Sequence, residues 1–221
     1  MQNALIIGAS GGIGSALSHA LSAQGVAVTG LSRREHGLDV TDEASVADIL
    51  GPLSDTFDLV FVATGGLEIS DHRPEKSLKD LSAEAMLAQF KLNTMGPALV
   101  LKHAQRLLPR DRRAVFAALS ARVGSIGDNQ LGGWYSYRTA KAALNQMLHG
   151  AAIELGRSHK QAICVALHPG TVATSLTRKY VGNHPAVAPE EAAQNLVNVM
   201  DGLTVDDTGG FFDWQGKRIP W

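Results

Sequence analysis

The feature that most constrains the fold is a glycine-rich turn close to the amino terminus. Residues 8–14 read GASGGIG, follow the short apolar run ALII of residues 4–7, and precede a stretch with helical periodicity over residues 15–24. A glycine turn between a strand and a helix lets backbone N–H groups and the positive end of the helix approach a pyrophosphate. The order of these three elements favours a dinucleotide site over a merely flexible turn.

The rest of the chain continues to alternate apolar strands with helices. We expect further strands at residues 26–31, 38–40, 57–66, 114–120, 162–167 and 209–214. The longer ones are almost continuous in apolar residues, as strands covered on both faces are. The pattern predicts an α/β fold, a Rossmann-type doubly wound parallel sheet of about seven strands with helices on both faces. We expect a single domain over residues 1–221, with its ligand across the carboxyl ends of the strands.

Composition excludes several classes of partner. The formal net charge of −1 gives no electrostatic footprint for nucleic acid or for an anionic membrane. The one cysteine, Cys164, cannot form an intrachain disulfide, and the apolar run within residues 1–7 is too short for a signal peptide or a membrane span. The eight histidines show no close pair at ligand spacing, so no metal site is predicted. We expect a cytoplasmic protein.

The end of the second predicted strand indicates the cofactor. In a doubly wound sheet this position meets the adenosine ribose, and here it carries Ser32 and Arg33. A carboxylate would bind the 2′-hydroxyl of NAD, whereas arginine pairs with the 2′-phosphate of NADP. We therefore expect NADP(H), although a solvated basic turn is the alternative. Asp39 could accept a hydrogen bond from the adenine amino group, or it could be a simple turn aspartate.

Tyr137 and Lys141 are the strongest candidates for proton chemistry. They are four residues apart in a predicted helix that begins near residue 134, so they share one face. A tyrosine ordinarily ionises near pH 10, and each unit of lowering takes about 1.4 kcal/mol of preferential stabilisation of the phenolate. A lysine ammonium one turn away supplies such stabilisation. The pair predicts a proton donor and acceptor for carbonyl and alcohol chemistry.

A proline interrupts the helix that we expect from residue 83 toward residue 108. Pro97 has no N–H group, so the backbone carbonyl of Asn93 loses its usual helical partner. The freed carbonyl and the amide side chain of Asn93 could both hold water. The alternative is a kinked core helix with an exposed asparagine.

The end of the sixth predicted strand carries His168, followed by Pro169. We interpret His168 as a packed strand-end residue, the commoner role for a histidine there. Beyond Thr174, the loop of residues 175–188 is short and polar, with Arg178, Lys179 and Gly182. A lid this short excludes little water, so we expect an open site with broad specificity.

Together these motifs resemble those of the short-chain dehydrogenase/reductase family over essentially the whole chain. Gly8, Gly12 and Gly14 match its glycine motif, and Asp39-Val40 resembles its adenine contact. The resemblance implies that Tyr137 is the acid or base, that Lys141 binds the ribose and lowers the pKa of Tyr137, and that Asn93 holds a relay water. The length and the carboxyl-terminal FDWQGKRIPW are similar to the branch of C-factor-like proteins and small NADPH carbonyl reductases. The family's Asn-Asn-Ala-Gly is VATG at residues 62–65.

The resemblance also implies a cofactor set. The residues from Pro169 to Thr174 resemble the segment around the nicotinamide carboxamide. The expected NADP(H)-binding residues are Gly8, Ser10, Gly12, Ile13, Gly14, Ser32, Arg33, Asp39, Val40, Ala63, Gly65, Tyr137, Lys141, Pro169, Gly170, Val172 and Thr174.

The fourth catalytic position of the family is a serine three residues before a glycine. Counting back from Gly124 places Ala121 there, with Ser120 one residue early. Neighbouring strand residues face opposite ways, so the offset matters unless the strand has already ended. We expect Ser120 to complete the site, with Ser125 and a site without serine as the alternatives.

The leading functional hypothesis is an NADP(H)-dependent oxidoreductase that reduces a small carbonyl compound with Tyr137 as general acid. An NADP-binding signalling or sensor protein with little turnover is the alternative, although a pure binder would not need Tyr137 and Lys141. An epimerase or dehydratase of the extended family needs a substrate domain for which 221 residues leave no room. Relatives associate through the helices around Asn93 and Tyr137, so we expect a homodimer or homotetramer.

Overall fold

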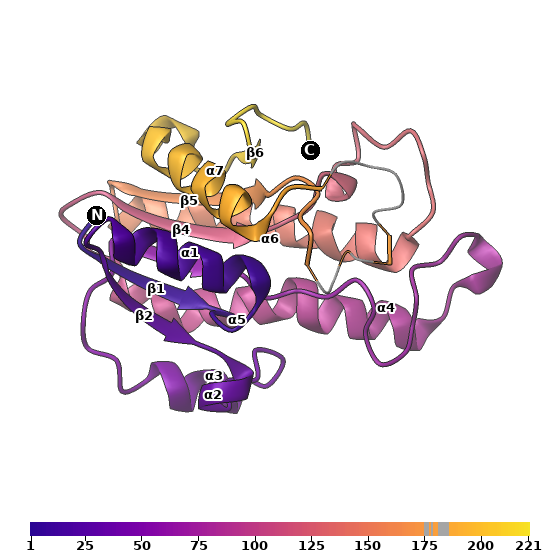
Figure 1. Cartoon of the computed structure of the whole chain (residues 1–221), viewed down its shortest axis with the longest axis horizontal. Helices are drawn as coiled ribbons and strands as arrows, with labels where there is room; N and C mark the ends of the chain where they lie inside the picture. Colours follow the sequence, from indigo (N-terminus) through magenta and orange to yellow (C-terminus); the bar gives the residue numbers. More distant parts are fainter. Residues whose placement is uncertain (175–176, 178, 181–185) are drawn as a thin grey trace.

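In the computed structural model, six parallel strands form one twisted sheet between two layers of helices (Figure 1). The structure describes residues 1–174, 177, 179–180 and 186–221. In spatial order the strands are β2 (Ala27–Leu31), β1 (Asn3–Ile7), β3 (Leu59–Val62), β4 (Ala114–Leu119), β5 (Ala162–His168) and β6 (Phe211–Asp213). The expected Rossmann-type doubly wound fold is thereby confirmed.

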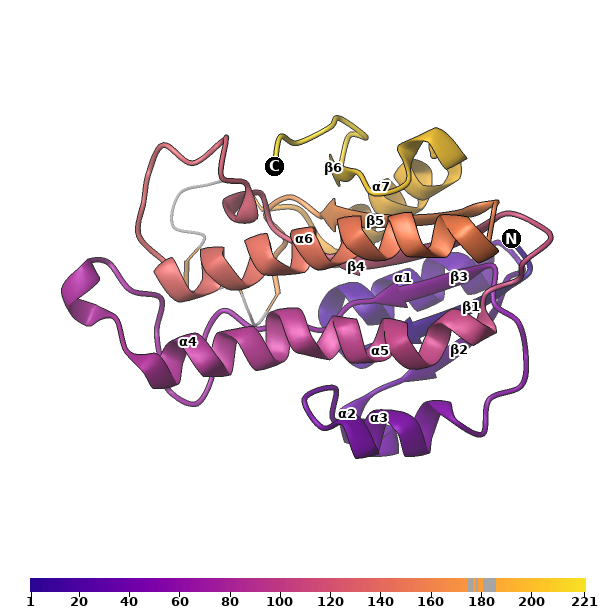
Figure 2. The same cartoon turned by 180° about the vertical axis from the view of Figure 1, so that it is seen from behind.

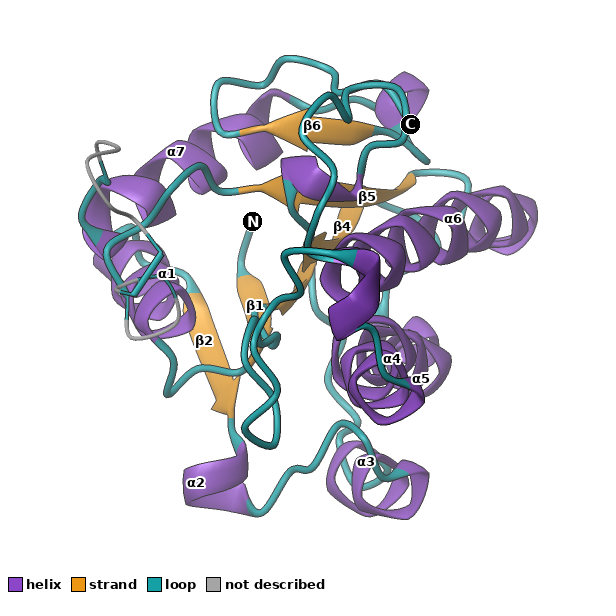
Figure 3. Ribbon diagram, turned by 90° about the vertical axis from the view of Figure 1, so that its right-hand side faces the viewer, coloured by secondary structure: helices purple, strands orange, loops and turns teal. Residues whose placement is uncertain are grey.

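The helices divide between the two faces of the sheet (Figures 2 and 3). One face carries α1 (Gly12–Ala23) and α7 (Pro189–Gly202). The other carries α3 (Glu43–Leu50), α4 (Ala83–Phe90), α5 (Gly96–Ala104) and α6 (Tyr135–Ser158), while the short α2 (Arg33–His36) follows β2. Short 3-10 turns lie at Leu78–Asp80, Gln105–Leu107, Arg122–Gly124 and Val205–Asp207. Within the described ranges, no helix has both the length and the apolar character needed to cross a bilayer.

The central strands are buried on both faces, as their apolar sequences predict. Val115 and Ala117 of β4 belong to the cluster beneath α1 and α7, while Phe116 and Ala118 belong to the cluster beneath α5 and α6. All six residues of β4 are buried. Alternate side chains of a strand point to opposite faces, so the two helix layers pack on one shared sheet.

The chain reverses direction across the sheet between β1 and β3. From β1 it passes outward to β2 and then returns to β3 on the other side of β1. Ile7, the last residue of β1, pairs with Leu31 and Val62, the last residues of β2 and β3. The turns after these strands therefore diverge at one edge of the sheet, the place where doubly wound folds bind ligands.

Residues 38–40 do not form the expected strand, and the described part of the chain has six strands where we expected about seven. Gly37 caps α2 in the left-handed conformation, and the Asp39 carboxylate accepts hydrogen bonds from the backbone N–H and the hydroxyl of Thr41. A segment this short, closed by its own side-chain bonds, is a turn.

The proline-containing helix is interrupted as expected, but by a different device. A π turn at Lys91–Met95 separates α4 from α5, and the N–H of Gly96 donates to the carbonyl of Lys91, five residues earlier. Pro97 then lies at the start of α5, where its missing N–H costs little. Single π turns of this kind are frequent at functional sites.

Candidate active site

Two cavities open along the carboxyl edge of the sheet and share one wall. The larger has a volume of about 900 Å³ and the smaller about 740 Å³. Both are lined by Gly11, Ala63, Thr64 and Gly65, from the turns after β1 and β3. The cavities therefore form a continuous groove at the point where the strand order reverses.

The tight turn after β1 requires glycine at two positions. Gly8 adopts φ +89°, a left-handed conformation that favours glycine. A Cβ on Gly14 would lie 2.2 Å from the carbonyl oxygen of Gly8, so the start of α1 could not approach the turn this closely. Gly11 gives α1 no side-chain cap, which leaves the first-turn N–H groups of the helix to face a ligand.

The smaller cavity extends to the residues predicted to meet the adenosine. Ser32, Arg33, Asp39 and Val40 all line it, together with Gly8 and Ser10. Arg33 is exposed, while the hydroxyl of Ser32 accepts a hydrogen bond from the N–H of Glu35. The hydrogen bonds from Thr41, aided by Arg33, lower the pKa of Asp39. Asp39 thus closes a turn and also lines the cavity, while its hydrogen bond to the adenine amino group stays a prediction.

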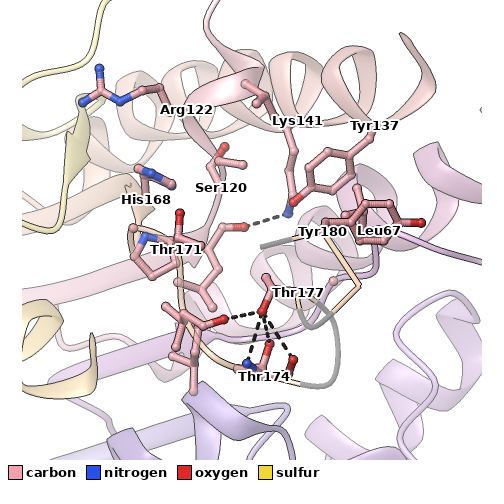
Figure 4. Close-up of a pocket in the computed structure, with 18 of the residues that line it drawn as sticks. Leu67, Ser120, Arg122, Tyr137, Lys141, His168, Thr171, Thr174, Thr177 and Tyr180 are labelled. Atoms are coloured by element: carbon pink, nitrogen blue, oxygen red, sulfur yellow. Dashed lines mark hydrogen bonds between the residues drawn. The ribbon is translucent and has the colours of Figure 1, made fainter. Parts of the chain in front are cut away.

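The larger cavity contains Tyr137 and Lys141 on one face of α6 (Figure 4). The Nζ of Lys141 donates a 2.8 Å hydrogen bond to the carbonyl oxygen of Leu119, the last residue of β4, and lies 5.8 Å from the centroid of the Tyr137 ring. Lys141 is only 3% exposed. The lysine therefore ties α6 to the end of β4 and fixes the tyrosine beside it.

Burial dominates the protonation of this pair. It raises the pKa of Tyr137 and lowers the pKa of Lys141 to about 7, because both charged forms would lose their hydration. The lowering of the Tyr137 pKa expected from the Lys141 ammonium has to overcome this burial, and it stays a prediction.

The start of α6 is held by two residues that the sequence reading missed. Trp134 adopts φ +51° and contacts the edge of the Tyr137 ring at 6.4 Å between centroids. The buried carboxylate of Glu75 accepts hydrogen bonds from the backbone N–H and the hydroxyl of Ser136. Left-handed backbone at a tryptophan is strained, and such strain concentrates at functional sites. The GlyGly pair of residues 132–133 was the only sequence signal for a sharp entry into this helix.

Asn93 is buried in the π turn and its side chain is fully used. Its Nδ2 donates to the carbonyl of Gly66 at 2.8 Å and to Oε1 of Gln89, and its Oδ1 accepts from the N–H of Gly66. The alternative of an exposed asparagine is therefore wrong. Of the two groups expected to hold water, only the backbone carbonyl is left for that role.

The serine candidates take different positions. Ser120 is buried and lines the larger cavity, but its hydroxyl donates to Oδ1 of Asn145 at 2.6 Å and points away from Tyr137 in Figure 4. Strand pairing continues to Ser120, whose N–H donates to Leu167, so the pleat is unbroken there. Ser125 does not line either cavity; its hydroxyl donates to the carbonyl of Pro220.

The expected nicotinamide segment follows β5. Pro169, Gly170, Val172 and Thr174 line the larger cavity, as do Gly12 and Ile13 across the groove. Gly170 has φ +79°, and a Cβ there would lie 3.0 Å from the Trp214 ring. This segment therefore runs between the carboxyl-terminal tail and the glycine turn.

Only part of the expected open lid can be compared with the structure. Arg178 and Gly182 lie outside the described residues. Lys179 and Tyr180 both bond to the carboxylate of Glu68, and the Tyr180 ring contacts Trp134 at 5.7 Å between centroids. The described part of this loop is thus attached across the larger cavity.

Comparison with known proteins assigns the family. A sequence profile described as Enoyl-(Acyl carrier protein) reductase, which belongs to the short-chain dehydrogenase/reductases, matches residues 8–210. The chain therefore belongs to the short-chain dehydrogenase/reductase family of oxidoreductases, and the resemblance seen in its motifs is confirmed.

Individual relatives are similar over most of the chain. The 1-hydroxy-2-glutathionyl-2-methyl-3-butene dehydrogenase of Rhodococcus sp. (strain AD45) is 32% identical over an alignment of 237 positions that covers 100% of both chains. C-signal of Myxococcus xanthus is 33% identical over 149 residues, 66% of this chain and 84% of that protein. NADPH-bound carbonyl reductase from chicken fatty liver superposes with a TM-score of 0.83 at 23% identity, covering 100% and 99% of the two chains, and supports the fold.

The burial of Lys141 predicts a pH-dependent stability. Its pKa is about 7 in the folded protein against an ordinary 10.5, so between these values the unfolded chain binds one more proton than the folded protein. The free energy of unfolding of the wild type should therefore rise from pH 7 to pH 10, relative to Lys141→Met, by up to about 1.4 kcal/mol per pH unit.

Urea denaturation at several pH values measures this difference. The exposed Lys160→Met controls for the loss of a lysine as such and should show no trend. A difference between the wild type and Lys141→Met that does not change with pH would contradict the burial of a neutral amine.

Proposed function

We propose that this protein is an NADP(H)-dependent oxidoreductase that reduces a small carbonyl compound, an aldehyde, ketone or oxoacyl group, within one dinucleotide-binding domain over residues 1–221. The observation that carries the proposal is the pair of a half-buried Tyr137 and a buried Lys141, both of which line the larger cavity next to the glycine turn. A protein that only bound a dinucleotide would need the glycine turn but not this pair.

The residues present fit NADP(H). The glycine turn leaves room for a pyrophosphate, and Arg33 supplies an exposed guanidinium for the 2′-phosphate. Thr64 supports the fit independently, since its Oγ1 is buried on the shared wall without a hydrogen-bond partner among the described residues. When bound, the nicotinamide supplies the hydride for the carbonyl carbon.

The chain's own residues supply the proton and hold the reacting groups. In the proposal Tyr137 donates its phenolic proton to the substrate oxygen as that oxygen gains charge, and Lys141 binds the ribose and stabilises the phenolate left behind. The backbone carbonyl of Asn93 holds the water that returns a proton to Lys141. Ser120 exchanges its bond with Asn145 for one to the substrate oxygen.

A signalling or sensor protein with little turnover is the second candidate, favoured by the 33% identity to C-signal. The Rhodococcus relative, similar over its whole length, is named as a dehydrogenase of a glutathionyl alcohol, which favours the enzyme. Turnover of NADPH with a carbonyl substrate separates the two candidates.

Arg33 should determine the preference for NADPH over NADH. Losing its charge-assisted contact should cost about 1.5 to 3 kcal/mol. Fluorescence titration of Arg33→Ala should therefore show roughly ten- to a hundredfold weaker NADPH binding, with NADH binding unchanged. Arg34→Ala is the matched control, because Arg34 pairs with Glu35 and does not line the cavity. Equal affinity of the wild type for both cofactors would refute the assignment.

The catalytic roles are tested by three substitutions. Tyr137→Phe should abolish carbonyl reduction while NADPH still binds, because only the acid is lost. Ser120→Ala should lower kcat on the order of a hundredfold, the usual effect of losing one donor to a developing oxyanion. Ser125→Ala, which removes a hydroxyl outside both cavities, should keep wild-type turnover. A kcat for Ser120→Ala within about threefold of wild type would remove Ser120 from the site.

We further propose a homodimer or homotetramer formed through α4 and α6. These helices pack together and expose large apolar side chains, Leu87 (61%), Phe90 (45%) and Ile153 (58%). Such a surface is typical of a protein interface. Sedimentation of the wild type should give a dimer or larger, and Phe90→Glu should shift it toward monomer, whereas Val205→Glu, at an exposed position outside both helices, should not. A monomeric wild type would contradict this interface.

A further inference from the structure

His168 is the histidine of the larger cavity, and none of the proposed steps uses it. It is the last residue of β5. On one side lies Ser120, whose backbone N–H donates to the carbonyl of Leu167, and on the other side His168 pairs with Asp213 of β6. Its side chain faces the α6 layer, because alternate residues of a strand share a face and Ala166, two residues earlier, belongs to the hydrophobic cluster beneath α6. Leu167 belongs to the cluster on the other face. Figure 4 shows His168 and Tyr137 on either side of Ser120.

The imidazole makes no hydrogen bond to any residue that the structure describes. Its Nδ1 is shielded from solvent without a partner among the described residues, and the residue lines the larger cavity. Buried polar groups in proteins are nearly always paired, so an unpaired imidazole on a cavity wall indicates a ligand. The packed strand-end role expected from the sequence does not account for it.

The surroundings select a neutral ligand group. The guanidinium of Arg122 is already paired with two carboxylates, of Asp128 at 3.0 Å and of Asp213 at 3.0 Å, so its charge is not left over for an anionic ligand group. Burial, helped by Arg122 and opposed by Asp213, lowers the pKa of His168 to about 4. A neutral imidazole carries one donor and one acceptor, which suits a carbonyl or a hydroxyl.

The walls around these polar groups are apolar. Leu67, Val123 and Trp134 line the same cavity as His168, and Tyr180 contacts Trp134. A ligand of this cavity therefore combines an apolar body with few polar groups. Tyr137 accounts for one of those polar groups, the reacting oxygen.

We propose that His168 is a specificity-determining residue that hydrogen-bonds a second, uncharged oxygen of the substrate, so that the preferred substrates are apolar dicarbonyl or hydroxycarbonyl compounds. This inference rests on the proposed function, since it takes Tyr137 as the partner of the first oxygen. The carboxamide of the cofactor has the same hydrogen-bonding chemistry, and the experiment separates the two sources.

The experiment compares kcat/KM for two aryl dicarbonyls, phenylpropanedione and benzoylacetone, with that for the monoketone propiophenone. His168→Leu should lower kcat/KM for at least one dicarbonyl by about tenfold, as loss of one neutral hydrogen bond does. It should change kcat/KM for propiophenone by less than about twofold. Taking the ratio between wild type and variant cancels the intrinsic reactivity of each ketone. His168→Gln keeps a donor and an acceptor, so it should recover most of the preference.

His159→Leu is the matched control. His159 is also a buried histidine with an unpaired ring nitrogen among the described residues, but it follows the far end of α6 and lines neither cavity. The His159→Leu substitution should leave both the ratio of kcat/KM values between dicarbonyl and monoketone and the NADPH dissociation constant unchanged. If His168→Leu does not fold, His168→Phe, which keeps a ring and loses both nitrogens, takes its place and should show the same loss of preference.

Three results would overturn the proposal. Unchanged dicarbonyl preference in His168→Leu means that the imidazole does not contact substrate. A rise in the NADPH dissociation constant that accounts for the whole loss assigns His168 to the cofactor. Equal dependence on His168 for the anionic phenylglyoxylate refutes selection for a neutral oxygen. A wild type that turns over none of these ketones refutes the proposed function instead, and thermal shifts of the protein–NADPH complex with the same compounds then test His168 without turnover.

Discussion

The site depends on the hydrogen bond from Nζ of Lys141 to the backbone carbonyl of Leu119. It joins the first turns of α6 to the end of β4, so it sets where Tyr137 stands relative to the sheet edge. Glu75 and Trp134 hold the same helix from its amino end, and Thr94 bonds the carbonyl of Ala140 from the π turn. Burying a lysine costs free energy. Here the buried lysine fixes the distance between Tyr137 and the groove, because its hydrogen bond holds α6 against the end of β4.

The groove itself follows from topology and close backbone approach. Parallel strands that end level with one another place the turns after Ile7 and Val62 at the same edge of the sheet, and the reversal of strand order sends the connections that follow them in opposite directions. Gly14 allows α1 to begin directly against Gly8. Cofactor cradle and proton donor are thus built by different parts of the chain, and they meet only because both lie at the carboxyl edge.

The fold could be predicted from the sequence because the strands are apolar, the helices periodic and the glycine turn specific. Residues 38–40 failed as a strand because three residues with a capping glycine and a turn-forming Asp39 have too few ladder partners. The positions of Tyr137, Lys141 and the glycine turn followed from spacing. The role of Glu75 could not be predicted from the sequence, because its partner Ser136 is 61 residues away. The orientation of Ser120 could not be predicted either, because it depends on Asn145 of another element. The unpaired imidazole of His168 becomes visible only when its three-dimensional contacts are known.

Carbonyl reduction at this site is tested most directly by NADPH consumption. The purified protein is mixed with NADPH and a panel of aldehydes, ketones and oxoacyl thioesters, and the alcohol formed is quantified against the NADPH lost. We expect sustained consumption, with one alcohol formed per NADPH, for at least one member of the panel. Tight NADPH binding with no consumption across the panel would contradict it, and would favour a protein that senses the cofactor.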